Sequence, residues 1–222
     1  MACTLENVLF KHNDNWHMQF SERAAVYHIM SVLKPDVSLE IGTFMCGSLH
    51  PIAEASKSVY TFDIDDRRQD GFENVDFIQG SSHETVPPII ASINTSDRDI
   101  NFILVDGAHD TAGVHADLVN CLAYRPKNGP TIILMHDSAN PDVRAGIKQV
   151  EWGAYPHVHM LDLDFVPGML YDRSDIRGQI WGGLAVAVML PEIRINPISL
   201  SSNFQHSLDV LMSRSVYSEK TP

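Results

Sequence analysis

Residues 39–48 read LEIGTFMCGS, and this stretch decides the fold class. A short apolar run that carries one acid, Glu40, passes through Gly42 and reaches Gly47 and Ser48 just before a segment compatible with a helix. A glycine-containing turn between a strand and a helix brings backbone N–H groups against a bound ligand. The stretch therefore predicts a ligand-binding turn in an α/β domain.

A second β-rich run, VYTFDID, follows about 20 residues later and places Asp63 at its end. An acid at this point can accept hydrogen bonds from both hydroxyls of a ribose. The two segments together predict a site for a nucleoside cofactor. The spacing Glu40-x-Gly42-x4-Gly47-Ser48 differs from the dinucleotide fingerprint G-x-G-x-x-G, and it lacks the Gly-Lys-Ser/Thr ending of a P-loop. An NAD-dependent oxidoreductase is disfavoured for this reason.

Strand-like and helix-like segments alternate from residue 36 to residue 150. The strand candidates are VSLEIG, VYTFDI, VDFIQG, INFILVDG and PTIILMHDS. The helix candidates that follow them are GSLHPIAEAS, HETVPPIIASI, TAGVHADLVNCLAYR and NPDVRAGIKQV. Short apolar runs separated by helices are the sequence form of repeated βαβ units and a parallel sheet. The pattern predicts a doubly wound α/β fold.

Further elements are expected on either side of this region. A helix is predicted over SERAAVYHIMSVLKP, with Ser21 as its N-cap and Pro35 at its end. Beyond residue 150, HVHML is a candidate sixth strand, residues 162–180 read as a loop, and WGGLAVAVML reads as a final strand. We assign its leading Trp-Gly-Gly to packing. The tail from residue 203 has apolar residues at helical spacing, which indicates a short amphipathic helix.

Composition excludes several classes of protein. The 222 residues suit one α/β domain, and 16 basic against 28 acidic residues give a net charge of −12, which argues against a nucleic-acid substrate. The longest apolar stretch, 182–191, is far shorter than the roughly 20 residues of a membrane-spanning helix. The N-terminus does not read as a secretory signal. Cys3, Cys46 and Cys121 are odd in number and scattered, so we expect reduced thiols in a cytoplasmic protein.

Two strand ends carry the residues with the greatest chemical potential. Asp106 ends the apolar run INFILVD, and His109 follows it three residues later; the next strand candidate ends in His136 and Asp137. The carboxyl ends of parallel strands meet at one edge of a sheet, which is where ligands collect. Two carboxylates and two imidazoles there could hold a divalent cation, position a hydroxyl or take its proton. The alternative use of both aspartates is to cap the helices that follow.

These segments resemble a known protein family and, more narrowly, one group of its members. The form E-x-G-x-x-x-x-G at 40–47, with an acid closing the second strand, resembles the class I S-adenosylmethionine-dependent methyltransferases. The combination VDGAHDTAGVHADL, KNGP and ILMHDS looks like their metal-dependent small-molecule members, in particular sugar and macrolide O-methyltransferases of natural-product biosynthesis. The resemblance covers residues 36–190 and implies a Rossmann-like sheet of seven strands, mostly parallel, with the last strand antiparallel. It also implies a single domain over 1–222, with a helical cap at 1–35 and a C-terminal extension at 191–222.

The resemblance implies roles for named residues. S-adenosylmethionine would be bound by the glycine turn, the acid of the second strand and a serine after the third strand, namely Glu40, Gly42, Gly47, Ser48, Asp63 and Ser82. Magnesium would be bound by Asp106 and the pair His136-Asp137, while His109 would be the general base and Asp106 would share in catalysis. One residue departs from the pattern: position 136 is His where metal-binding members often have a carboxylate or an amide, and magnesium prefers oxygen ligands.

The sequence therefore predicts an S-adenosylmethionine-dependent O-methyltransferase that acts on a hydroxyl of a small molecule, a sugar or another secondary metabolite, with assistance from a divalent cation. The alternatives are a metal-independent O- or N-methyltransferase and a catalytically silent cofactor-binding scaffold protein. The expected partners are the small-molecule acceptor and a second copy of the chain, with neither nucleic acid nor membrane.

Overall fold

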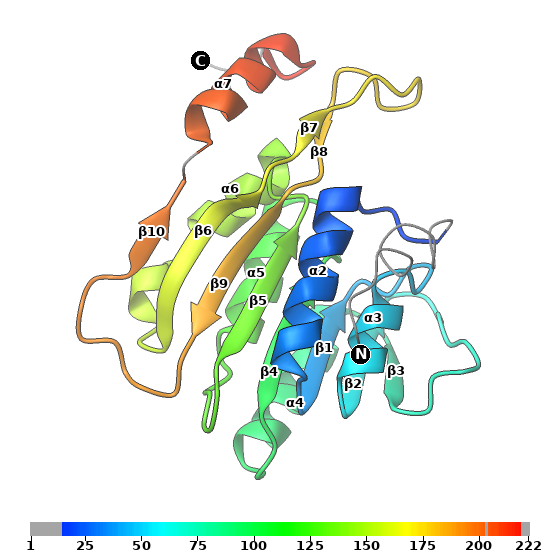
Figure 1. Cartoon of the computed structure of the whole chain (residues 1–222), viewed down its shortest axis with the longest axis vertical. Helices are drawn as coiled ribbons and strands as arrows, with labels where there is room; N and C mark the ends of the chain where they lie inside the picture. Colours follow the sequence, from blue (N-terminus) through cyan, green and yellow to red (C-terminus); the bar gives the residue numbers. More distant parts are fainter. Residues whose placement is uncertain (1–14, 203, 219–222) are drawn as a thin grey trace.

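The computed structural model describes residues 15–202 and 204–218, which form an α/β structure around one large sheet (Figure 1). Eight described strands lie in the order β10-β6-β9-β5-β4-β1-β2-β3. Their bounds are β1 Val37–Ile41, β2 Ser58–Asp63, β3 Val75–Gln79, β4 Ile100–Val105, β5 Thr131–His136, β6 Val158–Val166, β9 Leu184–Met189 and β10 Ser199–Ser201. Every neighbouring pair is parallel except the two that β9 makes. The predicted doubly wound α/β fold is confirmed.

Helices cover both faces of the sheet (Figure 1). One face carries α2 (Phe20–Leu33) and α3 (Leu49–Ala55), and the other carries α4 (Ser82–Asn94), α5 (Thr111–Cys121) and α6 (Pro141–Gln149). Alternate residues of the central strands pack toward opposite faces, so Leu104 joins the cluster under α2 while Ile103 joins the cluster under α5. Strands buried on both sides explain the continuous apolar runs of the sequence.

Strand β9 runs antiparallel to both β5 and β6, as expected for the closing strand. Two features of this side differ from the prediction. The sheet has an eighth strand, the three-residue edge strand β10, which pairs with β6. Strand β6 also extends to Val166, so the first part of 162–180 is strand and not loop. Asp164 lies within this strand, and Arg144 of α6 pairs with its carboxylate at 2.9 Å, so its charge is balanced at the sheet.

The predicted N-cap of the first described helix was wrong by two residues. Helix α2 begins at Phe20, and Gln19 is its N-cap in a capping box with Glu22 at the third helical position. Ser21 therefore lies inside the first turn. The chain leaves the helix through Lys34, whose φ of 45° places it in the left-handed region before Pro35. The predicted end is confirmed.

The C-terminal part of the described chain packs beside the sheet edge that carries the strand ends. A two-stranded hairpin, β7 (Met169–Leu170) with β8 (Ile180–Trp181), precedes β9. Helix α7 (Gln205–Arg214) is the predicted amphipathic helix, and its Leu208 packs with Ile180 and Ala139. The short helix η1 (Trp152–Ala154) joins α6 to β6. No described helix combines the length and the apolar character needed to cross a membrane. Cys46 and Cys121 are buried free thiols, and Cys3 lies outside the described residues.

The turn after β1 makes a close backbone contact with the turn after β4. Gly42 has a φ of +95°, and a Cβ at this position would lie 2.1 Å from the carbonyl oxygen of Asp106. Gly71 has a similar φ of +92° but has no atom within 4 Å of the same point. Replacing each glycine by alanine would therefore separate two contributions to stability: the strain of a left-handed backbone, present at both positions, and the steric clash of a Cβ, present at Gly42.

We expect Gly71→Ala to lower the free energy of unfolding by about 1–2 kcal/mol, the usual cost of a left-handed alanine. Gly42→Ala should cost a further ~1–3 kcal/mol or more, because the neighbour that must move is backbone. Urea unfolding of both variants measures the difference. Equal losses in the two variants would contradict the proposed close contact.

Candidate active site

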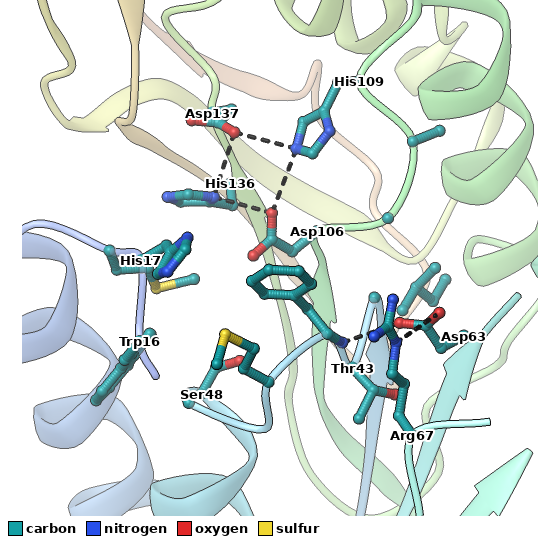
Figure 2. Close-up of a pocket in the computed structure, with 18 of the residues that line it drawn as sticks. Trp16, His17, Thr43, Ser48, Asp63, Arg67, Asp106, His109, His136 and Asp137 are labelled. Carbon is teal, nitrogen blue, oxygen red and sulfur yellow. Dashed lines mark hydrogen bonds and ion pairs between the residues drawn. The ribbon is translucent and has the colours of Figure 1, made fainter. Parts of the chain in front are cut away.

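A cavity of about 1040 Å³ opens at the carboxyl ends of β1, β2, β4 and β5. This volume lies at the upper end of the ~300–1,000 Å³ typical of ligand sites, so it can hold more than one small molecule. Figure 2 shows its two functional ends: Asp63 and Thr43 lie at one end, and the side chains of Asp106, His109, His136 and Asp137 gather at the other. The residues predicted to bind a cofactor and those predicted to do chemistry therefore line one cavity, with Glu40 as the exception.

The end near Asp63 has the form expected of a ribose site. Asp63 is the last residue of β2, and its carboxylate accepts a hydrogen bond from the backbone N–H of Phe44, at 2.9 Å. Arg67 lies 3.4 Å from the same carboxylate. Gly42 and Phe44 both have positive φ, which gives the turn its tight path beside Asp63. The contact orients the acid along the cavity wall.

Glu40 lies beneath this turn and is fully buried. Its two oxygens accept hydrogen bonds from the hydroxyls of Ser48 and Thr61, each at 2.7 Å. Burial raises the pKa of the Glu40 carboxyl to about 8, against the lowering effect of these two hydroxyls. Ser48 does line the cavity. Glu40 therefore supports the turn from below, and its hydrogen bond holds Ser48 at the start of α3.

The segment before α2 forms another wall of the cavity. Trp16, His17 and Met18 line it, and the ring of His17 lies 5.2 Å from the ring of Phe44. A Cβ on Gly47 would lie 2.4 Å from the Cα of Trp16, so this glycine leaves room for the segment. Gly47 thus serves the packing of the N-terminal wall as well as the turn.

Ser82 lines the cavity at the start of α4, and its hydroxyl donates to Asp117 of α5 at 2.5 Å. Asp117 is buried, and burial raises the pKa of its carboxyl. The other carboxylate oxygen of Asp117 has no hydrogen-bond partner among the described residues. The helix pattern of 111–121 gave no sign of this acid, because its contact with Ser82 depends on how α4 and α5 pack.

The opposite end of the cavity holds four interacting side chains from the ends of β4 and β5 (Figure 2). His136 Nδ1 lies 2.9 Å from Asp106 Oδ1 and 3.5 Å from Asp137 Oδ2. His109 Nε2 lies 3.1 Å from Asp137 Oδ2 and 3.8 Å from Asp106 Oδ1. Each imidazole therefore faces both carboxylates. The structure brings together all four residues that the sequence placed at this edge.

The backbone of Asp137 turns sharply to direct its side chain into the cluster. Its φ of 55° is in the left-handed region, which is uncommon for a residue other than glycine. One carboxylate oxygen accepts a hydrogen bond from Gly182 N–H at 2.6 Å, and the other faces His109. Asp106 and Asp137 cap neither following helix, since Asp110 caps α5 and Asn140 caps α6. The capping alternative for the two acids is excluded.

The carboxylates control the charge of both imidazoles. Hydrogen bonding to Asp106 and Asp137 raises the pKa of His109 to about 9. Burial opposes a charge on His136, but Asp106 and Asp137 outweigh it and raise the pKa of His136 well above its ordinary value. The pKa of Asp106 is correspondingly lowered, against the effect of burial. Without other ligands, the cluster is therefore a network of alternating charges.

The donor set of this cluster fits a divalent cation. One ligand atom each from Asp106, His136 and Asp137 lies within 4.8 Å of the others, so one ion could contact all three. Sequence reasoning missed two nearby groups. Trp181 lines the cavity and packs against the ring of His109, at 5.6 Å between centroids. Glu22 of α2 lies 3.4 Å from His136, and no motif in the sequence connects these two residues.

Comparison with known proteins gives the fold. No protein-family model and no curated protein matches the chain. An O-methyltransferase from Bacillus cereus, solved in complex with SAH, has 16% identity and a TM-score of 0.54, and the match covers 86% of this chain and 91% of that chain. The cofactor-bound Rv0187 from MTB has 15% identity and a TM-score of 0.54, with 76% and 78% covered. The chain has the Rossmann-like fold of these structures.

The buried Glu40 predicts how stability depends on pH. Its pKa is about 8 in the folded state against 4.5 ordinarily, so the folded state binds more protons than the unfolded state between these values. The neutral carboxyl of Glu40 is therefore favoured in the folded state. The stability that depends on this proton is fully present below the unfolded pKa and is lost as pH rises through about 8. We therefore expect the free energy of unfolding of the wild type, relative to Glu40→Gln, to fall between about pH 5 and pH 8. Urea unfolding at several pH values measures it. The exposed Glu54→Gln is the control, and a constant difference between wild type and Glu40→Gln would contradict the expectation.

Proposed function

We propose that this protein is an S-adenosylmethionine-dependent O-methyltransferase that transfers a methyl group to a hydroxyl of a small molecule. The observation that carries the proposal is the single cavity with a ribose-type acid at one end and two carboxylates and two imidazoles at the other. The solved O-methyltransferase with SAH, which shares the fold, supports the assignment of the cofactor.

The cofactor half of the site would hold the nucleoside by three groups. Asp63 would accept hydrogen bonds from the ribose hydroxyls, since its carboxylate is already oriented along the wall by Phe44 N–H. The turn 42–48 would present backbone N–H groups to the carboxylate of the cofactor. Ser82, the first residue of α4, lines the cavity and would contact the base of the nucleoside.

The other half of the site would prepare the acceptor. S-adenosylmethionine supplies a methyl group that its sulfonium already activates, so the protein chiefly has to align the acceptor oxygen with it. His109 is the group placed to take the hydroxyl proton, because its ring is nearly half exposed at 46% while its Nε2 faces the cluster. Trp181 packs edge-on against this ring and limits its movement. Tyr171 and Arg173 line the cavity on the same side and would contact the acceptor.

A divalent cation held by Asp106, Asp137 and His136 would lower the pKa of an acceptor hydroxyl bound to it. The same two carboxylates that such an ion would engage now hold the proton on His109, so the base would be freed from them. The alternative is a metal-independent O- or N-methyltransferase in which Asp106 and His109 act directly on the acceptor. Loss of turnover on adding a chelator distinguishes the first from the second.

The class of acceptor follows from the cavity and the charge of the chain. A net charge of −12 disfavours an acceptor with a phosphate backbone, and a cavity of about 1040 Å³ that also has to hold the cofactor favours a small one. We propose a sugar or another secondary metabolite as acceptor. We also propose a cytoplasmic location, which the free thiols of Cys46 and Cys121 support. A second copy of the chain is the proposed macromolecular partner.

Calorimetry with S-adenosylhomocysteine tests the cofactor half. We expect micromolar binding by the wild type and at least about tenfold weaker binding by Asp63→Ala, because a charged hydrogen bond contributes roughly 1.5–3 kcal/mol. Asp70→Ala removes the same charge from an exposed position in the next loop and should bind as the wild type does. No binding by the folded wild type would overturn the proposed function.

Replacement of the proposed base tests the catalytic half. His109→Gln should lower the rate of methyl transfer by about 10²–10⁴-fold, the usual contribution of a general base, while S-adenosylhomocysteine affinity stays within about threefold. S-adenosylhomocysteine production with a panel of hydroxylated sugars and phenols measures the rate. His115→Gln, on α5 outside the cavity, is the control. Unchanged turnover in His109→Gln would remove the assigned role.

A further inference from the structure

Glu22 is a buried acid that the proposed reaction does not use. It lies on α2, outside the sheet, and is completely enclosed. One carboxylate oxygen accepts from Gly183 N–H, at the turn into β9. The other accepts from Gln19 N–H and lies 3.4 Å from His136 Nε2. These contacts fix the carboxylate between the helix, the closing strand and the cluster.

His136 is therefore held between acids on both of its nitrogens. Its Nδ1 faces the cavity side, with Asp106 and Asp137 at 2.9 and 3.5 Å, and its Nε2 faces Glu22 on the inner side. Asp106 at 2.9 Å holds a proton on Nδ1, so an ion that binds this nitrogen displaces that proton, and Glu22 keeps the one remaining proton on Nε2. The lone pair of the other nitrogen, Nδ1, then points between the two aspartates.

We infer that Glu22 is a positioning residue that fixes His136 for coordination through Nδ1, and that the site of Asp106, His136 and Asp137 selects a first-row transition cation over magnesium. The inference rests on the proposed function for the use of the ion in methyl transfer. Metal selection itself is a property of the three ligands and Glu22, and it can be measured without cofactor or acceptor.

The ligand chemistry supports this selection. Magnesium prefers oxygen ligands in octahedral geometry and keeps several waters, whereas imidazole suits zinc, iron, cobalt and nickel. Ligand atoms about 2.0–2.2 Å from a tetrahedral ion lie ~3.3–3.6 Å apart. The separation of 3.5 Å between His136 Nδ1 and Asp137 Oδ2 lies in this range, whereas Asp106 Oδ1, at 2.9 Å from Nδ1, would have to move outward to bind the same ion. Three protein ligands also leave a position for an acceptor hydroxyl, as in catalytic zinc sites.

The arrangement around His136 matches the usual support of a metal-binding imidazole. Such a histidine donates its second N–H to a carboxylate or a carbonyl, which fixes both the tautomer and the ring orientation. Glu22 satisfies this role from a helix that precedes the whole sheet in sequence. The backbone N–H of Gly183 in turn holds Glu22, so the carboxylate cannot rotate toward the cavity.

A competing explanation is a buried ion pair that only attaches α2 to the sheet. The two explanations differ in what Glu22→Gln changes. An amide at this position can donate to His136 Nε2, which moves the imidazole proton to Nδ1, where the ion would bind. The positioning role therefore predicts a loss of affinity for transition cations that exceeds any loss for magnesium. A purely structural role predicts equal changes for all ions.

The test is a titration of the chelator-treated full chain with Mg²⁺, Co²⁺ and Zn²⁺, read by calorimetry and by the visible absorption of bound Co²⁺. We expect Co²⁺ and Zn²⁺ to bind on the order of 100-fold more tightly than Mg²⁺. Glu22→Gln should weaken Co²⁺ and Zn²⁺ binding by about 10–100-fold and change the Co²⁺ spectrum. Glu54→Gln, an exposed acid on α3, should leave both unchanged.

A second variant covers the case in which Glu22→Gln does not fold. His136→Asp gives an all-oxygen set and should lower the preference for Co²⁺ over Mg²⁺ at least about tenfold. Equal affinity of the wild type for Mg²⁺ and Co²⁺ would overturn the metal selection, and an unchanged ratio in folded Glu22→Gln would overturn the positioning role. Metal selection with no S-adenosylhomocysteine binding would refute the proposed function but leave the metal site standing, and the reverse result would refute only the metal inference.

Discussion

At Gly42 the turn after β1 passes so close to the turn after β4 that a Cβ would lie 2.1 Å from the carbonyl oxygen of Asp106. This contact joins the two halves of the cavity. The turn after β1 carries the N–H of Phe44, which orients Asp63, and the turn after β4 begins with Asp106, an acid of the cluster. The distance between the Asp63 end of the cavity and the end that holds the carboxylates and imidazoles is thus set by backbone contact, which no rotation of side chains can change.

The layered fold and the edge that carries the site follow from features present in the sequence. Apolar runs alternate with helical segments up to α6, and Asp106 and His136 each end such a run, so the rule that ligands meet strand ends places them together. Two parts of the structure could not be predicted from the sequence. Residues 162–166 read as a loop in the sequence, because the partner of Asp164 is Arg144, on a helix that sequence spacing does not connect to it. Glu22, whose carboxylate contacts His136, lies more than a hundred residues before it in the sequence, so no local spacing connects the two residues.

The polarity of β9 explains another part of the site that was not foreseen. An antiparallel strand begins at the edge where its parallel neighbours end, so its entry turn brings backbone N–H groups to the carboxyl-end edge. Gly182 and Gly183 occupy this turn with φ of +74° and +86°, and they donate to Asp137 and Glu22. The Trp-Gly-Gly sequence, which we assigned to packing, supplies the donors that hold two acids of the site in place.

The hairpin β7–β8 stands apart from these fixed parts. Its base is anchored where Gly168 packs against Ala139 and Gly182, and Val216, which follows α7, donates its backbone N–H to the carbonyl of Gly178 in the hairpin loop. Its tip, which carries Tyr171 and Arg173, lines the cavity but contributes nothing to the cluster or to the turn 42–48. Under the proposed function, exchange of the hairpin tip alone would change the choice of acceptor and leave the cluster of carboxylates and imidazoles unaltered, which offers a route by which a chain of this design could diverge toward new substrates.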